Sequence, residues 1–138
     1  MFENFKSILL RGFVVWLIII FAEFIHGTLR VFLLQPIVGD FSARQIAVFS
    51  GMVIILIISL ILVRWMRAEN NSQLIAVGVF WLILTLSFEI LLGRFGFNLS
   101  WERIFSDYNI LNGGLLPIGL IFLVFAPLIA ENVRKTFF

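Results

Sequence analysis

Four long runs of apolar residues, joined by short polar segments, constrain this chain of 138 residues more than any other feature. A helix needs about 20 residues to cross the ~30 Å hydrocarbon core of a bilayer. Backbone polar groups in lipid must be satisfied within the segment, so each run is expected to be an α-helix. The sequence therefore predicts an all-α integral membrane protein, an antiparallel four-helix transmembrane bundle in a single domain, 1–138. The predicted spans cover residues 8–34, 43–66, 74–92 and 115–130.

Composition excludes the main alternative classes. The chain is 62% hydrophobic and 13% charged, whereas soluble domains average about 25% charged residues. In a soluble fold, this composition would leave large apolar patches against water. Disorder requires low hydrophobicity, and nucleic-acid binding requires a strongly basic face, which a net charge of +2 does not supply. We expect the lipid bilayer as the surroundings and no nucleic acid as a partner.

The connections between the runs predict helix ends. Pro36 and Gly39 are stop signals after the first run, and Ser42 is the expected N-cap of the second helix. The second connection, 67–72, is also short and offers polar capping residues. Such short connections imply antiparallel neighbouring helices. We expect both helices of each hairpin to begin and end close to these signals.

The third connection is longer and has a pattern of its own. Trp101, Ile104, Phe105 and Tyr108 recur at the spacing of one helical face. Aromatic residues of this kind favour the membrane interface. The sequence predicts a short interfacial helix over about 101–108, before the last span.

Lysine and arginine residues near the span ends predict the orientation in the membrane. One side carries Lys6, Arg11, Arg64, Arg67, Arg134 and Lys135. The other side carries Arg30, Arg44, Arg94 and Arg103. This bias places both termini in the cytoplasm, in a bacterial-type inner membrane.

Most of the remaining polar residues are predicted to lie in the outer half of the bundle. Glu23, His26 and Arg30 share one face of the first span. An ionised group at the centre of a membrane helix costs about 2.5–3.5 kcal/mol, so this stripe should face protein, water or a ligand. The main candidates for ligand binding or ion coupling are Glu23, His26, Arg30, Glu89, Arg94, Asp107 and Tyr108. Secondary candidates are Asp40, Arg44, Asn109 and Asn112.

Several interpretations of this polar cluster stay open. It could be structural, with Glu23, Glu89, Arg30 and Arg94 forming ion pairs between helices. It could be an outward-facing pocket in which arginines, with Arg103 among them, bind or help to transport a small polar or anionic ligand or a lipid headgroup. A third interpretation is proton coupling, with Glu23 as the first candidate and Glu89 as the second.

Enzymatic chemistry has weaker support. Glu23 and His26 have the spacing of a carboxylate–imidazole pair on a helix, and with Glu89 they are the only candidate metal ligands or catalytic groups. The chain has one histidine and no cysteine, so no metal and no other cofactor is predicted. Ser59 is expected to lie far from His26, and Ser50 lies nearer, but neither has a G-x-S-x-G setting.

Small residues on the second predicted span bear on how the helices, or copies of the chain, pack together. Ala43, Ala47 and Gly51 form a stripe of small residues that allows close helix approach. The stripe can pack inside the bundle or at a homo-oligomer interface. A second class of function is an accessory subunit of a larger membrane complex, docked through the apolar faces.

Overall fold

The structure, a computed structural model, describes residues 2–137 and contains no strand among them. The all-α transmembrane prediction is confirmed, because four helical stretches are long and apolar enough to cross a membrane: Asn4–Val38, Asp40–Met66, Asn71–Gly96 and Leu116–Phe137. In chain order the elements are α1 (Phe2–Leu29), η1 (Arg30–Leu34), α2 (Gln35–Val38), α3 (Asp40–Met66), α4 (Asn71–Leu91), η2 (Leu92–Gly96), α5 (Trp101–Ser106), η3 (Ile110–Asn112) and α6 (Leu116–Phe137).

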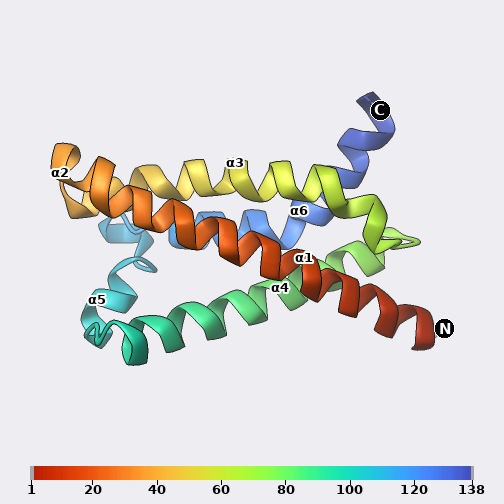
Figure 1. The fold of residues 1–138 in the computed structure, drawn as a ribbon, viewed down its shortest axis with the longest axis horizontal. Helices are drawn as coiled ribbons and strands as arrows, with labels where there is room; N and C mark the ends of the chain where they lie inside the picture. The colour runs from red at the N-terminus through yellow and green to blue at the C-terminus, as the bar shows by residue number, and fades with distance from the viewer. Residues whose placement is uncertain (1, 138) are drawn as a thin grey trace.

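The four long helices form an antiparallel bundle (Figure 1). Helix α6 packs against α3 and α4, and α1 packs against the same two helices. Both ends of the chain lie at one end of the bundle, together with the α3–α4 connection, whereas α2 and α5 lie at the opposite end (Figure 1). We call the end with α2 and α5 the α2–α5 end.

The first connection is much tighter than the sequence predicts. The first helix continues through a π-helical turn, η1, and past Pro36 to Val38. Pro36 is tolerated because it lies in the first turn of α2, where its missing N–H removes little. Gly39, at φ 88°, reverses the chain in a single residue. The prediction of Ser42 as N-cap is therefore wrong, because Asp40 is already helical and Gly39 takes the cap position.

Two other helices begin with a side-chain cap. The Asn70 side chain accepts a hydrogen bond of 2.9 Å from the backbone N–H of Gln73 at the start of α4. The Ser100 side chain accepts one of 3.1 Å from the N–H of Arg103 at the start of α5. Each cap satisfies a backbone donor that a helix N-terminus leaves free.

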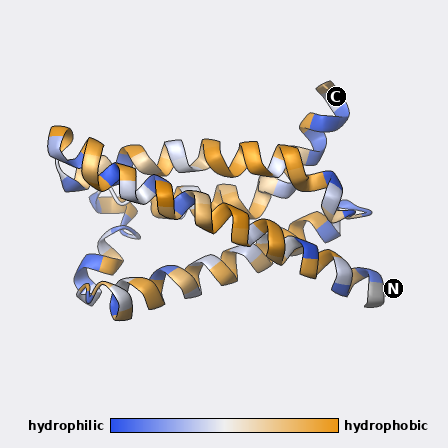
Figure 2. Ribbon diagram, viewed as in Figure 1, coloured by the Kyte–Doolittle hydropathy of each residue, from blue (hydrophilic) through white to orange (hydrophobic). Residues whose placement is uncertain are grey.

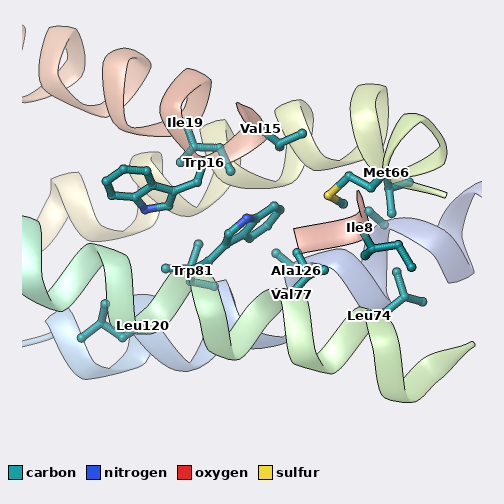
Figure 3. Packing of buried hydrophobic residues seen from close by; sticks show 13 residues of the cluster. Ile8, Val15, Trp16, Ile19, Met66, Leu74, Val77, Trp81, Leu120 and Ala126 are labelled. Carbon is teal, nitrogen blue, oxygen red and sulfur yellow. The ribbon is translucent and has the colours of Figure 1, made fainter. Parts of the chain in front are cut away.

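The half of the bundle nearer the chain termini is densely packed (Figure 3). Trp81 is fully buried and donates a hydrogen bond of 2.8 Å from its indole to the carbonyl of Gly12. Trp16 donates one of 2.9 Å to the hydroxyl of Thr85. Ile8, Val15, Ile19, Met66, Leu74, Val77 and Ala126 fill the space around them. These contacts tie α1 to α4 and leave the indole N–H groups satisfied.

Apolar residues make up most of the long helices (Figure 2), and many of their side chains are exposed on the outside of the bundle. Phe21, Ile61, Ile83 and Ile121 are each more than half exposed. Such a surface is costly in water and suits the hydrocarbon of a bilayer. Together with the four long apolar helices, it identifies an integral membrane protein. The small-residue stripe packs within the bundle, since Ala43 and Gly51 are buried.

Candidate functional site

A cavity of about 720 Å³ lies in the half of the bundle toward the α2–α5 end. Its walls come from α1, η1, α3, α4, α5 and α6. Eight of the residues predicted from the sequence line it: Glu23, His26, Arg30, Asp40, Arg44, Glu89, Asp107 and Tyr108. The cavity thus collects side chains from helices that are far apart in the sequence.

Two arginines and two aspartates form a closed ring of ion pairs at the α2–α5 end. Arg44 lies 3.1 Å from Asp40 and also pairs with Asp107. Arg103 lies 3.2 Å from Asp107 and 3.8 Å from Asp40. The four formal charges cancel, so the ring adds no net charge to the cavity. It also fastens α5 to α3, which holds the third connection against the bundle. We call these four residues the ion-pair ring.

Arg30 lies beside this ring without joining it. It lines the cavity, and its charge interacts with all four members of the ring. Within residues 2–137, no ion pair or side-chain hydrogen bond involves Arg30. Its Nε is buried without a hydrogen-bond partner in that part of the chain. Arg30 is therefore the cation of this region whose charge the described protein leaves uncompensated by direct contact.

Glu23, His26 and Ser50 form a chain of polar contacts between α1 and α3. His26 Nδ1 lies 3.5 Å from Glu23 Oε2. His26 Nε2 lies 2.7 Å from Ser50 Oγ. An ionised Glu23 favours the proton on Nδ1, in which case Nε2 accepts the hydrogen bond from Ser50. Gly51 makes room for Glu23, because a Cβ at this position would lie 3.0 Å from Oε2.

Ser50, His26 and Glu23 touch one another in the same sequence as the members of a serine–histidine–carboxylate catalytic triad. Their surroundings, however, do not suit nucleophilic catalysis. The side chain of Ser50 is not among those that line the cavity. Ser50 also lies in the middle of α3, where helical hydrogen bonds occupy the backbone N–H groups. A nucleophile needs donors placed to stabilise an oxyanion, and this stretch of helix offers none from its backbone. The chain of contacts instead fixes α1 against α3 and orients Glu23.

Glu89 on α4 and Tyr108 in the third connection line another part of the cavity. Glu89 Oε2 is buried and has no hydrogen-bond partner among the described residues. Burial, followed by the charges of Glu89 and Asp107, raises the pKa of the Tyr108 phenol above its ordinary value. Tyr108 is therefore a neutral hydrogen-bonding group beside Glu89 at neutral pH. Glu23, on the facing helix, also has a buried oxygen, Oε1, without a described partner.

Three candidates predicted from the sequence lie outside the cavity lining. The guanidinium of Arg94 donates a hydrogen bond of 3.2 Å to the carbonyl of Leu99 and lies 5.4 Å from the ring centre of Trp101. Asn109 and Asn112 are exposed in the turns before α6. Arg94 therefore stabilises the third connection, and the two asparagines shape its turns.

The contact between Ser50 and His26 was not predicted from the sequence. A signal for it existed, because Ser50 follows Ala47 by three residues and belongs to the same small-residue face of the second span. Gly51 of that face lies against Glu23 of the first helix. A polar residue on it was therefore a natural partner for His26.

The structure also bears on two alternative interpretations. Among residues 2–137, no group of three histidine, cysteine, aspartate or glutamate side chains could hold a metal ion. Glu23, His26 and Glu89 are thus not assembled as metal ligands. The ion pairs that connect different helices involve Arg44 with Asp107 and Arg103 with Asp40, rather than the pairs expected from Glu23, Glu89, Arg30 and Arg94.

Comparisons with protein-family models, with curated proteins and with solved structures find no match to this chain.

Proposed function

We propose that this membrane protein binds, in the cavity toward the α2–α5 end, a small ligand that carries an anionic group together with hydrogen-bond donors. Arg30 would hold the anionic group, and Glu23 and Glu89 would accept hydrogen bonds from the donors. The proposal is for a binding protein and not for an enzyme.

The observation that carries this proposal is the difference between Arg30 and its arginine neighbours. Arg44 and Arg103 are each matched by two aspartates in the ion-pair ring. Arg30 lines the same cavity and has no such partner in the described chain. A guanidinium presents planar donors that fit phosphate or carboxylate oxygens. An anionic ligand would supply the missing ion-pair partner of Arg30; the buried Nε without a hydrogen bond is a feature that Arg30 shares with Arg44.

The two glutamates define the other half of the expected ligand. Glu23 and Glu89 both line the cavity, and each has a buried carboxylate oxygen without a described hydrogen-bond partner. Buried polar atoms in folded proteins are nearly always hydrogen-bonded. A ligand ammonium or hydroxyl group would supply the missing donors. Water would supply them in the empty cavity.

The depth of Arg30 supports a site near one membrane surface. Arg30 follows Arg11 by 19 residues, which corresponds to about 28 Å of helix. Arg64 follows Arg44 by 20 residues on α3, or about 30 Å. These lengths match the hydrocarbon thickness. Arg30 and Arg44 would therefore lie at one interface and Arg11 and Arg64 at the other.

The excess of lysine and arginine at the end with the chain termini supports a cytoplasmic location for that end. The cavity would then lie in the half of a bacterial-type inner membrane that is farther from the cytoplasm. The cytoplasmic half is filled by Trp16, Trp81 and the side chains around them, which favours binding over passage through this conformation. Transport would require this packed half to open, and a homo-oligomer is not needed to complete the cavity.

The test uses O-phosphoethanolamine, which combines a phosphate with an ammonium group, and purified protein in a detergent that carries no phosphate. We expect O-phosphoethanolamine to raise the melting temperature of the native chain and to form a one-to-one complex in native mass spectrometry. Arg30→Gln should weaken the complex roughly tenfold or more, since a charge-assisted contact is lost.

Arg94→Gln is the matched control, because this arginine lies at the same end of the bundle but outside the cavity lining. It should bind O-phosphoethanolamine as the native chain does. Equal losses in Arg30→Gln and Arg94→Gln, or no binding to the native chain, would contradict the proposal.

A further inference from the structure

We infer that the ligand is a phospholipid whose headgroup carries hydrogen-bond donors, such as an ethanolamine or glycerol headgroup, and that it enters from the bilayer between α1 and α4. This inference rests on the proposed binding function and names its ligand class. The same phosphate and donor chemistry could come from a soluble phosphomonoester, so the experiment below separates the two sources.

Helices α1 and α4 separate beside the cavity. Helices α1 and α4 approach closely near Gly12, where a Cβ would lie 3.1 Å from Val77. From that crossing the two helices diverge toward the α2–α5 end (Figure 1). The cavity lies between the diverging halves, with α3 and α6 also lining it and α5 at its end. In this view no helix among residues 2–137 lies in front of the diverging halves of α1 and α4 (Figure 1). In a membrane, lipid would meet this side of the bundle.

The exposed residues that line the cavity are mainly apolar. Phe24, Phe32 and Phe97 line the cavity and are 51%, 72% and 60% exposed. Thr28, Val31 and Phe41 also line the cavity and are exposed, so five of the six exposed lining residues are apolar. Phe24 and Phe32 belong to α1 and η1, and Phe97 follows η2. An apolar exposed lining suits acyl chains, whereas a path for a soluble anion would be expected to have polar walls.

Arg30 and the two glutamates lie at different depths along the membrane normal. Glu23 precedes Arg30 by seven residues, so its Cα lies about 10 Å deeper. A phosphate at the depth of Arg30 would lie near the interface, where lipid phosphates are found. Donors that reach Glu23 and Glu89 then require a headgroup that points into the cavity, while the acyl chains leave sideways between α1 and α4.

The size of the cavity agrees with this arrangement. A volume of about 720 Å³ lies within the ~300–1,000 Å³ of pockets for small molecules. It accommodates a headgroup and the first part of the chains, and the remainder of the chains would stay in the bilayer. Ile19, Ile20, Leu120 and Leu123 provide the apolar part of the lining.

The main experiment compares phosphatidylethanolamine with phosphatidylcholine, which has a phosphate and a positive charge but no N–H donor. The delipidated protein is titrated with each lipid of identical acyl chains and measured by native mass spectrometry. We expect phosphatidylethanolamine to bind roughly tenfold more tightly than phosphatidylcholine, a difference of about 1.4 kcal/mol. Arg30→Gln should weaken binding of both lipids, and Glu23→Gln with Glu89→Gln should remove most of the preference between them. Arg94→Gln should leave both values unchanged.

The outcomes separate this inference from the proposed function. Tighter binding of O-phosphoethanolamine than of phosphatidylethanolamine would overturn the lipid inference and leave the binding function standing. Equal affinity for the two lipids, unchanged in Arg30→Gln, would indicate nonspecific lipid association and would also overturn the inference. Absence of binding by either lipid or by O-phosphoethanolamine would overturn both proposals.

A second measurement tests the entry route. The chain has no cysteine, so a single cysteine can be labelled without removing others. A bulky maleimide on Phe32→Cys, in the exposed part of the cavity lining, should reduce phosphatidylethanolamine binding several-fold. The same label on Ile61→Cys, which lies on the lipid-facing side of α3 and outside the cavity lining, should not. Equal binding by the two labelled proteins would overturn entry between α1 and α4.

Discussion

Arg44 at the start of α3 and Asp107 at the end of α5 form an ion pair across 63 residues of sequence. The pair closes the ion-pair ring and fastens the third connection over the cavity. Arg44 is only 11% exposed, so water screens the pair less than it screens a surface ion pair. The ring is thus a structural fastening whose charges cancel, beside Arg30, which lines the cavity and has no ion-pair partner among the described residues.

Replacing Asp107 by asparagine tests whether the ion-pair ring stabilises the fold without taking part in anion binding. Asp107→Asn removes one charge from the ring and leaves Arg44 and Arg103 sharing Asp40. We expect the free energy of unfolding to fall by about 1–3 kcal/mol, because a partly buried pair is broken. Anion binding should persist, since the cavity gains net positive charge. Unfolding in mixed micelles and titration with O-phosphoethanolamine measure the two effects.

Glu102→Gln is the control for that measurement. Glu102 is adjacent to Arg103 on α5 but is exposed, and it is in none of the ion pairs among the described residues. Its replacement should change stability by less than about 0.5 kcal/mol. Similar losses in Asp107→Asn and Glu102→Gln, or loss of anion binding in Asp107→Asn, would contradict the structural role of the ring.

The hydrogen bond between Trp16 and Thr85 gives a prediction for the packed half of the bundle. Thr85→Val keeps the shape of the side chain and removes the acceptor of the buried indole N–H. The unsatisfied donor should lower stability by about 1–3 kcal/mol. Thr85→Ser keeps the hydroxyl and should lose less. Thermal unfolding followed by tryptophan fluorescence compares the two variants, and a larger loss in Thr85→Ser would contradict the assignment.

Much of the fold could be predicted from the sequence because the bilayer imposes a simple rule. Runs of about 20 apolar residues had to be helices, and short connections had to make them antiparallel. The face shared by Glu23, His26 and Arg30 was also predictable, because spacings of three, four and seven residues return to one side of a helix. These residues do line a single cavity.

The position of Arg94 outside the cavity could not be predicted from helical spacing. Arg94 follows Glu89 by five residues, a spacing that does not return to the same helical face. It also lies in the π-helical turn η2, which changes the angular spacing of side chains from that of an α-helix. The ion-pair partners of Arg44 and Arg103 could not be predicted from the sequence either, because they depend on how the third connection folds back over the bundle.

The contact between α4 and α6 depends on Gly78. A Cβ at this position would overlap the backbone carbonyl of Val124, and backbone atoms have little freedom to move away. Gly78→Ala should therefore lower stability by at least about 1–3 kcal/mol, as overpacked core substitutions do. Gly27→Ala is the control, because no atom lies within 4 Å of its Cβ position. That variant should be neutral or stabilising by up to about 1 kcal/mol. A stability ranking in the opposite order, measured by thermal unfolding in detergent, would contradict the close packing of α4 on α6.

Tyr108 allows the electrostatics of the cavity to be measured directly, because it is the only tyrosine in the chain. Burial and the charges of Glu89 and Asp107 raise the pKa of its phenol in the folded state above the ordinary value of 10.0. As the pH rises through 10, the unfolded chain would lose this proton while the folded protein keeps it, so stability should fall with increasing pH in that range. Ultraviolet absorbance of phenolate should show a midpoint above 10 in the native chain. Glu89→Gln removes one of the charges and should lower that midpoint, whereas Glu102→Gln should not. An ordinary midpoint in the native chain, or the same midpoint in Glu89→Gln, would show that Tyr108 does not face a buried carboxylate.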